Sequence, residues 1–235
     1  MSKSIIIGGT SGIGAQICAQ LEKQNAEFIF TGTKESVSEY NLPFKNHKYF
    51  QFNALNSDNG QLPEIESVSS IFYCPGTISL KPFNRLTEDD FLNDYKVNVL
   101  GAVKVLQKYI NTLKTTPNAS IVLFSTVAVA QGMAFHTSIS ASKGAIETLT
   151  RSLAAELAPH IRVNCIALSL TDTPLAEKLL NTEEKKASAS KRHPLQAYGN
   201  PSDIAELALF LSSDASKWIT GQVIHADGGL STLRV

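Results

Sequence analysis

The sequence has little cysteine, and its few cysteines form no recognisable framework. Of 235 residues only Cys18, Cys74 and Cys165 are cysteine, an odd number spread far apart. Each lies among apolar residues, which is typical of small buried side chains rather than of disulfides. None has the spacing of a metal ligand, so we expect no bound metal.

Net charge and long apolar runs are also missing. The 21 basic and 21 acidic side chains cancel to a formal net charge of zero. A neutral chain has no broad positive field, which argues against nucleic acid as a partner. The longest apolar stretch, Ile121–Ala130, is interrupted by Ser125 and Thr126 and has about half the length of a membrane span. We therefore expect no membrane partner.

The N-terminus shows no export signal. Three isoleucines followed by glycine are far too short for the apolar centre of a signal peptide. Apolar residues make up 43% of the chain and charged residues 18%, which is ordinary for a globular protein. We expect a cytoplasmic protein with one large core.

Short β-rich runs alternate with longer helical patterns along the whole chain. The expected strands are Ser4–Ile7, Phe28–Thr31, Tyr49–Phe52, Val68–Tyr73, Ser120–Ser125, Arg162–Ala167 and Gln222–His225. The expected helices are Gly12–Asn25, Glu88–Leu113, Ser138–Leu157 and Pro201–Leu211. Several strands are continuous apolar runs, as in parallel strands covered on both faces. With no linker or repeat, this predicts a single α/β domain over residues 1–235, a doubly wound parallel (Rossmann) sheet of about seven strands.

One irregular stretch, Leu168–Asn200, breaks the alternation. It contains a polar patch rich in lysine and serine, Asn181–Lys191. A long segment at this place predicts a mobile substrate lid rather than a domain boundary. A plain solvated helix and loop is the alternative.

The first expected strand runs directly into a glycine-rich turn, and a helix follows. The turn spans Gly8-Gly9-Thr10-Ser11-Gly12-Ile13-Gly14. Glycines there leave the backbone amides open to a pyrophosphate, and the helix N-terminus adds partial positive charge. Its position between strand and helix makes a cofactor site the better interpretation than a mere tight turn. We expect Gly8, Thr10, Ser11, Gly12, Ile13 and Gly14 to bind the cofactor.

The tip of the second expected strand suggests which dinucleotide binds. An acid commonly stands there to hold the ribose hydroxyls of NAD, but this chain has Gly32, followed by Thr33 and Lys34. No acid repels a 2′-phosphate at Gly32, and Lys34 could attract one. We therefore expect NADP(H), with Thr33 and Lys34 as contacts. Glu35 argues the other way, so NAD stays possible.

The spacing G-x-x-x-G-x-G of Gly8, Gly12 and Gly14 resembles the short-chain dehydrogenase/reductase family, although Ile7 stands where that family usually has threonine. The resemblance covers nearly the whole chain. Its C-terminal third, with Gly199–Ala205 and Asp227-Gly228-Gly229, is similar to relatives of 3-oxoacyl-carrier-protein reductase. The resemblance implies a homo-oligomer, a tetramer or a dimer.

The resemblance also implies an active site, in which two of four residues match. Asn98 matches the family asparagine that holds a relay water, and Lys143 matches the lysine that binds the nicotinamide ribose. Thr126 replaces serine and keeps a hydroxyl that could orient a substrate carbonyl. Ile139 replaces the catalytic tyrosine and has no ionisable proton. Losing a general acid typically lowers a rate by roughly 10²- to 10⁴-fold.

Further departures lie along the cofactor path. Of the family's Asn-Asn-Ala-Gly only Gly76 survives, and Asn53 replaces an aspartate near the adenine ring. Thr171 and Thr173 match positions that contact the nicotinamide amide in relatives. The resemblance thus assigns Gly76, Asn53, Thr171 and Thr173, together with Lys143, to the cofactor.

Other protic groups could replace the tyrosine. His136 lies three positions before Ile139, and an imidazole ring can give or take a proton. Tyr73 is a phenol at the end of an expected strand. Ser138 and Ser140 flank Ile139, but their hydroxyls are weak acids. The simpler interpretations are a loop histidine and a strand-end tyrosine.

Two functions remain open. The first is an NADP(H)-dependent oxidoreductase that reduces a ketone or a 3-oxoacyl thioester by an altered mechanism, with Lys143, Thr126 and Asn98 as catalytic residues. The second is a catalytically inactive member that binds cofactor as a sensor or structural subunit, which Ile139 favours. We favour the reductase, because the lysine and the glycine turn are intact.

Overall fold

Seven parallel strands form one sheet in the order β3-β2-β1-β4-β5-β6-β7. The computed structural model describes residues 3–42, 44, 47–56 and 62–234. The strands are β1 (Lys3–Ile7), β2 (Phe28–Gly32), β3 (Lys48–Gln51), β4 (Val68–Tyr73), β5 (Ala119–Thr126), β6 (Ile161–Leu168) and β7 (Val223–Ala226). The chain order reverses between β1 and β4, so a crevice for a ligand lies at the carboxyl ends of these two strands.

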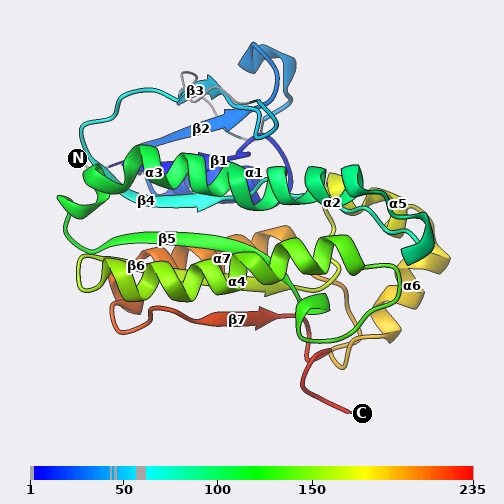
Figure 1. Cartoon of the computed structure of the whole chain (residues 1–235). Coiled ribbons are helices and arrows are strands. Elements are labelled where there is room, and N and C mark those ends of the chain that lie inside the picture. The colour runs from blue at the N-terminus through cyan, green and yellow to red at the C-terminus, as the bar shows by residue number, and fades with distance from the viewer. Residues whose placement is uncertain (1–2, 43, 45–46, 57–61, 235) are drawn as a thin grey trace.

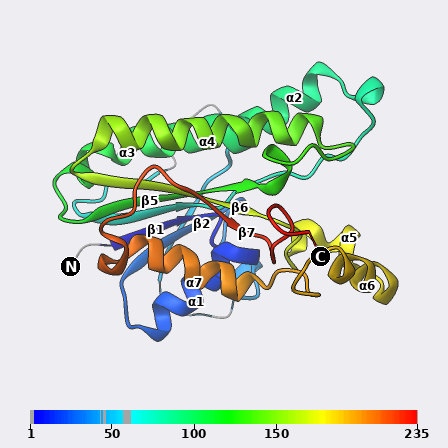
Figure 2. The same ribbon diagram turned by 90° about the horizontal axis from the view of Figure 1, so that it is seen from below.

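Helices cover both faces of this sheet. They are α1 (Gly12–Lys23), α2 (Glu88–Tyr95), α3 (Gly101–Lys114), α4 (Thr137–Leu157), α5 (Glu177–Leu180), α6 (Glu183–Lys191) and α7 (Pro201–Ser212). α3 and α4 lie on one face and α1 and α7 on the other, while α5 and α6 lie beyond the carboxyl ends of the strands (Figures 1 and 2). In the described part of the chain, no helix has both the length and the apolarity needed to cross a membrane.

The core has two halves because alternate side chains of each strand point to opposite faces. Ile5 and Ile7 of β1 belong to the half under α3 and α4. Ile6 packs in the other half with Ile17 of α1 and Ile204 of α7. A strand buried on both faces must be apolar at every position, which explains the continuous apolar runs. The predicted single α/β domain with a seven-stranded parallel sheet is confirmed.

The element boundaries differ from the predicted ones in one important place. The predicted helix Glu88–Leu113 is divided into α2 and α3 by a π-helical turn, Lys96–Leu100. A π turn widens the helix and often occurs at functional sites. Asn98 lies in this turn, so the irregularity coincides with a predicted site residue. The periodicity of the apolar residues gave no sign of it.

The predicted lid, Leu168–Asn200, contains three short helical segments. A 3₁₀ turn at Pro174–Ala176 leads into α5, and α6 takes up most of the polar patch. Thr182 caps α6 by accepting a hydrogen bond from the backbone amide of Lys185 at 3.2 Å. The segment covers the carboxyl ends of the strands (Figure 1). Its movement as a lid stays a prediction.

Candidate active site

The glycine-rich turn between β1 and α1 leaves its amides open. Gly8 and Gly12 have φ angles of +75° and +52°, which side chains rarely tolerate. A Cβ at Gly14 would lie 2.3 Å from the carbonyl oxygen of Gly8, so only glycine fits. The first amides of α1 have no carbonyl partner within the helix, and Ser11 makes no side-chain cap bond within the described chain. The turn therefore presents amides and a helix N-terminus suited to an anion.

Gly32 at the tip of β2 lies against the side chains of Thr10 and Tyr40, which any side chain at this position would have to displace. A Cβ there would lie 2.6 Å from Cγ2 of Thr10 and 2.7 Å from the hydroxyl oxygen of Tyr40. Lys34 lies next to this tip. Its Nζ donates to the carbonyl oxygen of Glu39 at 2.9 Å and lies 4.9 Å from the centre of the Tyr40 ring. This end of the crevice thus has an exposed cation and no acid at the strand tip.

Thr33 and Asn53, which were also predicted to contact the cofactor, form hydrogen bonds with neighbouring residues. The carbonyl oxygen of Thr33 accepts from Nε2 of Gln51 at 3.0 Å, which ties the ends of β2 and β3 together. Oδ1 of Asn53 accepts from the amide of Leu55 at 3.0 Å. Asn53 therefore caps the turn after β3, a role that its type in a turn would predict.

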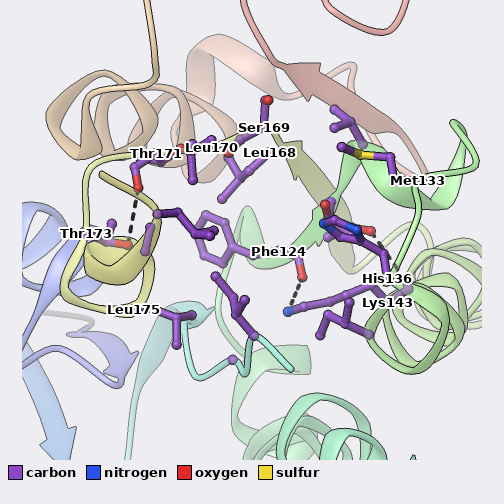
Figure 3. A pocket seen from close by; sticks show the side chains of 18 of the residues that line it. Phe124, Met133, His136, Lys143, Leu168, Ser169, Leu170, Thr171, Thr173 and Leu175 are labelled. Carbon is purple, nitrogen blue, oxygen red and sulfur yellow. Dashed lines mark hydrogen bonds between the residues drawn. The ribbon is translucent and has the colours of Figure 1, made fainter. Parts of the chain in front are cut away.

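A cavity of about 310 Å³ opens at the carboxyl ends of the strands. Its walls come from the ends of β5 and β6, from α4 and from the predicted lid. In Figure 3 the ring of Phe124 lies between Thr171 and Thr173 on one side and Lys143 and His136 on the other. Most of the wall is apolar side chain, several of them leucines. Such a cavity suits a mainly apolar ligand held by a few polar groups.

Lys143 lies inside this cavity and is 9% exposed. Its Nζ donates to the carbonyl oxygen of Phe124 at 2.9 Å (Figure 3). Burial lowers the lysine pKa to about 8, although Cys165, Cys74 and Asp94 oppose that shift. A buried ammonium with one protein acceptor has hydrogens left to donate to a ligand.

Asn98 has one unsatisfied buried atom. Its Nδ2 donates to Oγ1 of Thr77 at 2.9 Å and to the carbonyl oxygen of Asp94 at 2.8 Å. Its Oδ1 is buried with no partner among the described residues. A Cβ built on Gly76 would lie 3.5 Å from this oxygen and 3.6 Å from Nζ of Lys143. An unsatisfied acceptor and an ammonium thus flank one small space, which fits a bridging water or ligand hydroxyl.

Asp94 belongs to the same network, and sequence reasoning missed it. It is buried, and its carboxylate accepts from the hydroxyls of Thr77 and Ser138 at 2.6 Å each. It lies one helical turn before Asn98, so the spacing i, i+4 was a readable signal. The signal was weak because an aspartate on a helix is usually solvated.

The structure brings Thr126 and Ile139 to the wall of the cavity. Oγ1 of Thr126 accepts from the amide of Ala128 at 3.3 Å, so its hydrogen can still point to a ligand. Ile139 is 5% exposed and offers only hydrocarbon. The site therefore has a hydroxyl and an ammonium, but no phenol at the position of Ile139.

Three of the four alternative proton donors do not line the cavity. Tyr73 is buried, and its hydroxyl donates to the carbonyl oxygen of Val97 at 2.6 Å. Burial raises the pKa of this phenol. The hydroxyls of Ser138 and Ser140 donate to Asp94 and to the carbonyl oxygen of Ala128. Only His136 lines the cavity.

Thr171 and Thr173 lie at the start of the predicted lid, where it approaches the glycine turn. Both line the cavity, and a Cβ on Gly12 would lie 3.3 Å from Cβ of Thr173. The hydroxyl of Thr171 donates to the carbonyl oxygen of Ser169 at 3.0 Å. The structure thus places these threonines, Gly12 and Lys143 around the same crevice.

The sequence analysis also missed a hydrogen-bonded pair, Ser169 and His193. Oγ of Ser169 lies 2.7 Å from Nε2 of His193, and Nδ1 of this histidine lies 2.7 Å from the carbonyl oxygen of Ala189. Both residues line the cavity and His193 is buried. The pair fastens the end of α6 to the end of β6. No local spacing pairs a serine after β6 with a histidine 24 residues later, so no clear signal for the pair was readable in the sequence.

The cysteines are buried or partly buried, and none is paired. Burial raises the pKa of both Cys74 and Cys165 to about 12, with Lys143 opposing each shift. Thiols with such pKa values stay protonated near neutrality and are poor nucleophiles. Residues 3–42, 44, 47–56 and 62–234 contain no group of three or more His, Cys, Asp or Glu placed to hold a metal.

The parallel sheet and the glycine-rich turn define a protein of the Rossmann class, and comparison with known proteins identifies its family. The sequence profile described as Enoyl-(Acyl carrier protein) reductase matches residues 64–231. The chain is 33% identical to the 3-oxoacyl-[acyl-carrier-protein] reductase of Thermotoga maritima over 96% of each protein. It is 32% identical to a tropinone reductase homolog of Arabidopsis thaliana, over 97% of this chain and 92% of that one.

Solved structures of this family have the same fold as this chain. A short chain dehydrogenase family protein from Francisella tularensis superposes with a TM-score of 0.87 at 25% identity, over 99% of this chain and 100% of the other. ElxO with NADP bound superposes with a TM-score of 0.86 at 23% identity, over 99% and 100% of the two chains. The chain belongs to the short-chain dehydrogenase/reductase family.

Proposed function

We propose that this protein is an NADP(H)-dependent oxidoreductase that reduces a ketone or a 3-oxoacyl-type carbonyl in an active site without tyrosine. One observation carries the proposal: Lys143 Nζ and Asn98 Oδ1 flank the same space beside Gly76. Neither atom is fully used by the protein. A family scaffold that had lost all use for its cofactor would have no need of an unsatisfied buried acceptor.

The residues present fit a dinucleotide. The turn at Gly14 excludes any side chain, and the uncapped N-terminus of α1 leaves amides for a pyrophosphate. Lys143 would hold the nicotinamide ribose, and Thr171 and Thr173 the amide beside it. When bound, the cofactor supplies the hydride. Gly32 and Lys34 support NADP(H), as does the fold relative ElxO, which was solved with NADP.

The chain's own residues would then orient the carbonyl. Thr126 donates its hydroxyl hydrogen toward the carbonyl oxygen, and the apolar wall excludes water around it. The names of two relatives suggest the class of substrate, since one is a 3-oxoacyl-[acyl-carrier-protein] reductase and the other a tropinone reductase homolog. Both names are consistent with a substrate whose carbonyl group is attached to a mainly apolar molecule.

The direct test is cofactor binding followed by turnover. Calorimetry should give tighter binding of NADPH than of NADH. NADPH oxidation should then appear with at least one member of a panel of cyclic ketones and a 3-oxoacyl thioester. Lys143→Ala should abolish it, while the exposed Lys114→Ala, at the end of α3, should not. Folded protein that binds neither dinucleotide at millimolar concentration would refute the proposal.

A catalytically inactive cofactor binder is the second candidate, and Ile139 favours it. Ile139→Tyr separates the two. If the wild type is inactive and this variant gains turnover, the protein is an idle scaffold acting as sensor or structural subunit. If the wild type is active and the larger tyrosine side chain lowers the rate, Ile139 is part of an active site that works without a phenol.

Assembly and location complete the proposal. We expect a cytoplasmic homo-oligomer, a tetramer or a dimer. Trp218, just before β7, is 97% exposed in the isolated chain, and β7 is an edge strand. A large exposed indole and an open strand edge are features that a second subunit would cover. Light scattering on the purified protein measures the mass directly.

A further inference from the structure

Most hydroxyls in the cavity are already committed to the protein. A hydroxyl that donates to a protein carboxylate or carbonyl cannot also donate its hydrogen to a substrate. Such donors are Thr77 to Asp94, Ser125 to Glu147, Thr171 to the Ser169 carbonyl and Thr173 to the Thr171 carbonyl. Ser169 and His193 are bonded to each other. Thr126 keeps a free hydrogen, but an alcohol is too weak an acid to release it near neutrality.

His136 is different, because one ring nitrogen has no partner in the described chain. Its Nδ1 lies 2.7 Å from the carbonyl oxygen of Ala134. A carbonyl can only accept, so Nδ1 carries a proton and the neutral ring leaves Nε2 with a free lone pair. Nε2 therefore gains a proton only in the imidazolium. This ring can give or take a proton at Nε2 without breaking its own anchoring bond.

The helix places this ring where the phenol is missing. His136 is the residue before the first turn of α4, and Ile139 and Lys143 follow at i+3 and i+7 on the same helix face. All three line the cavity together with Thr126. Figure 3 shows His136 and Lys143 entering the cavity from the same side. The imidazole thus lies one turn before Ile139, on the helix that also carries Lys143.

The backbone before His136 is strained. Phe135 has a φ of +68°, a left-handed conformation that a bulky residue rarely adopts, and its side chain is 55% exposed. The amide of Lys81 holds the carbonyl of Phe135 at 3.2 Å. An exposed phenylalanine gains nothing from this conformation itself. The residue that follows it, His136, lines the cavity, and strained backbone of this kind clusters at functional sites.

From these observations we infer that His136 is the proton donor and acceptor of the active site, in place of the absent tyrosine. The inference rests on the proposed function. In reduction, the hydride that the reduced dinucleotide would supply adds to the carbonyl carbon, and the C=O π pair moves to oxygen. That oxygen takes the proton from Nε2 of the imidazolium, and the ring returns to the neutral form with Nδ1–H on Ala134. In oxidation the neutral Nε2 takes the hydroxyl proton of the alcohol, while the hydride on its carbon would pass to the oxidised dinucleotide.

The first test needs no turnover. Long-range ¹H–¹⁵N spectra of the full chain should show the Nδ1–H tautomer for neutral His136. Diethyl pyrocarbonate should acylate His136 at Nε2, and NADP⁺ together with cyclohexanol or a 3-hydroxyacyl thioester, the alcohol forms of the panel compounds, should protect it. His160, exposed at the far end of α4, is the internal reference and should react equally with and without ligand. An Nε2–H tautomer, or labelling of His136 unchanged by ligand, would overturn the inference.

The second test compares variants on an accepted carbonyl. His136→Phe should lower kcat by roughly 10²- to 10⁴-fold with little change in KM. Free imidazole should restore part of the rate to His136→Ala, which a merely structural role would not allow. His160→Gln should keep the wild-type rate. An active wild type with equally active His136 variants defeats this inference alone, whereas a wild type that never consumes NADPH defeats the proposed function and the inference together.

Discussion

Oδ1 of Asn98 and Nζ of Lys143 face each other across the space beside Gly76. A Cβ at Gly76 would lie 3.5 Å from the oxygen and 3.6 Å from the nitrogen. The oxygen comes from a π-helical turn and the nitrogen from the middle of α4, 45 residues further along the chain. One is a buried acceptor without a partner, and the other a buried donor with hydrogens to spare.

Filling the space beside Gly76 should slow the reaction without unfolding the protein. In Gly76→Ala the methyl makes ordinary van der Waals contacts, and the backbone angle is not in the left-handed region. It should displace a bridging water and lower kcat roughly tenfold, which corresponds to about 1.4 kcal/mol of barrier. Steady-state kinetics and thermal unfolding measure both effects. Gly132→Ala is the control, because its Cβ would meet nothing within 4 Å. Equal kinetics for the two variants would show that the space has no role.

Replacing Lys143 should change how stability depends on pH. Its pKa is lowered from 10.5 to about 8 by burial, so between these values the unfolded chain binds more protons than the folded one. The free energy of unfolding of the wild type therefore rises with pH from 8 to 10.5. Below pH 8 the lysine is charged in both states, so the whole cost of burying its charge destabilises the folded protein. Lys143→Met removes this dependence. Urea unfolding at pH 7 and pH 10 should show the wild type gaining on the variant by roughly 3 kcal/mol at most. A difference between the proteins that does not change with pH would contradict the shifted pKa.

Gly14→Ala should remove cofactor binding and weaken the fold. Its Cβ would lie 2.3 Å from the carbonyl oxygen of Gly8, and backbone cannot give way as a side chain can. We expect a loss of roughly 1–3 kcal/mol of stability and no measurable NADPH binding. Gly144→Ala on α4 is the matched control. Its Cβ would meet only Cγ1 of Val129 at 3.7 Å, so a gain of roughly 0.5–1 kcal/mol is expected. NADPH binding that survives Gly14→Ala would mean that the dinucleotide sits elsewhere.

Lys34→Glu should reverse the preference between the two dinucleotides. Lys34 is the exposed cation beyond the tip of β2, where Gly32 leaves no acid. A carboxylate there repels a 2′-phosphate, so the dissociation constant for NADPH should rise about tenfold or more, and that for NADH should change little. Calorimetry on both ligands gives the ratio, with Lys114→Glu as the control for net charge. An unchanged ratio of the two dissociation constants would show that Lys34 does not contact the 2′-phosphate.

Local pattern along the chain decided most of the architecture. The apolar runs at Ile5–Ile7 and Ile121–Leu123 predict strands covered on both faces, and the sheet has them there. The glycine turn was readable because glycine adopts the positive φ angles found at Gly8 and Gly12 without the strain that a side chain brings. These features depend on backbone states and on which face a side chain takes, and both repeat over a few residues.

Only the tertiary structure decided which side chains meet. Tyr73 was readable as a phenol near the cofactor, yet packing turns its hydroxyl to Val97. Asp94 and the pair of Ser169 and His193 gave little sign of their partners, which lie 44 and 24 residues away. Where a side chain points, and whether its polar atom is satisfied, depends on contacts between segments far apart in the chain. No local spacing encodes those contacts, because they exist only once the layers have packed.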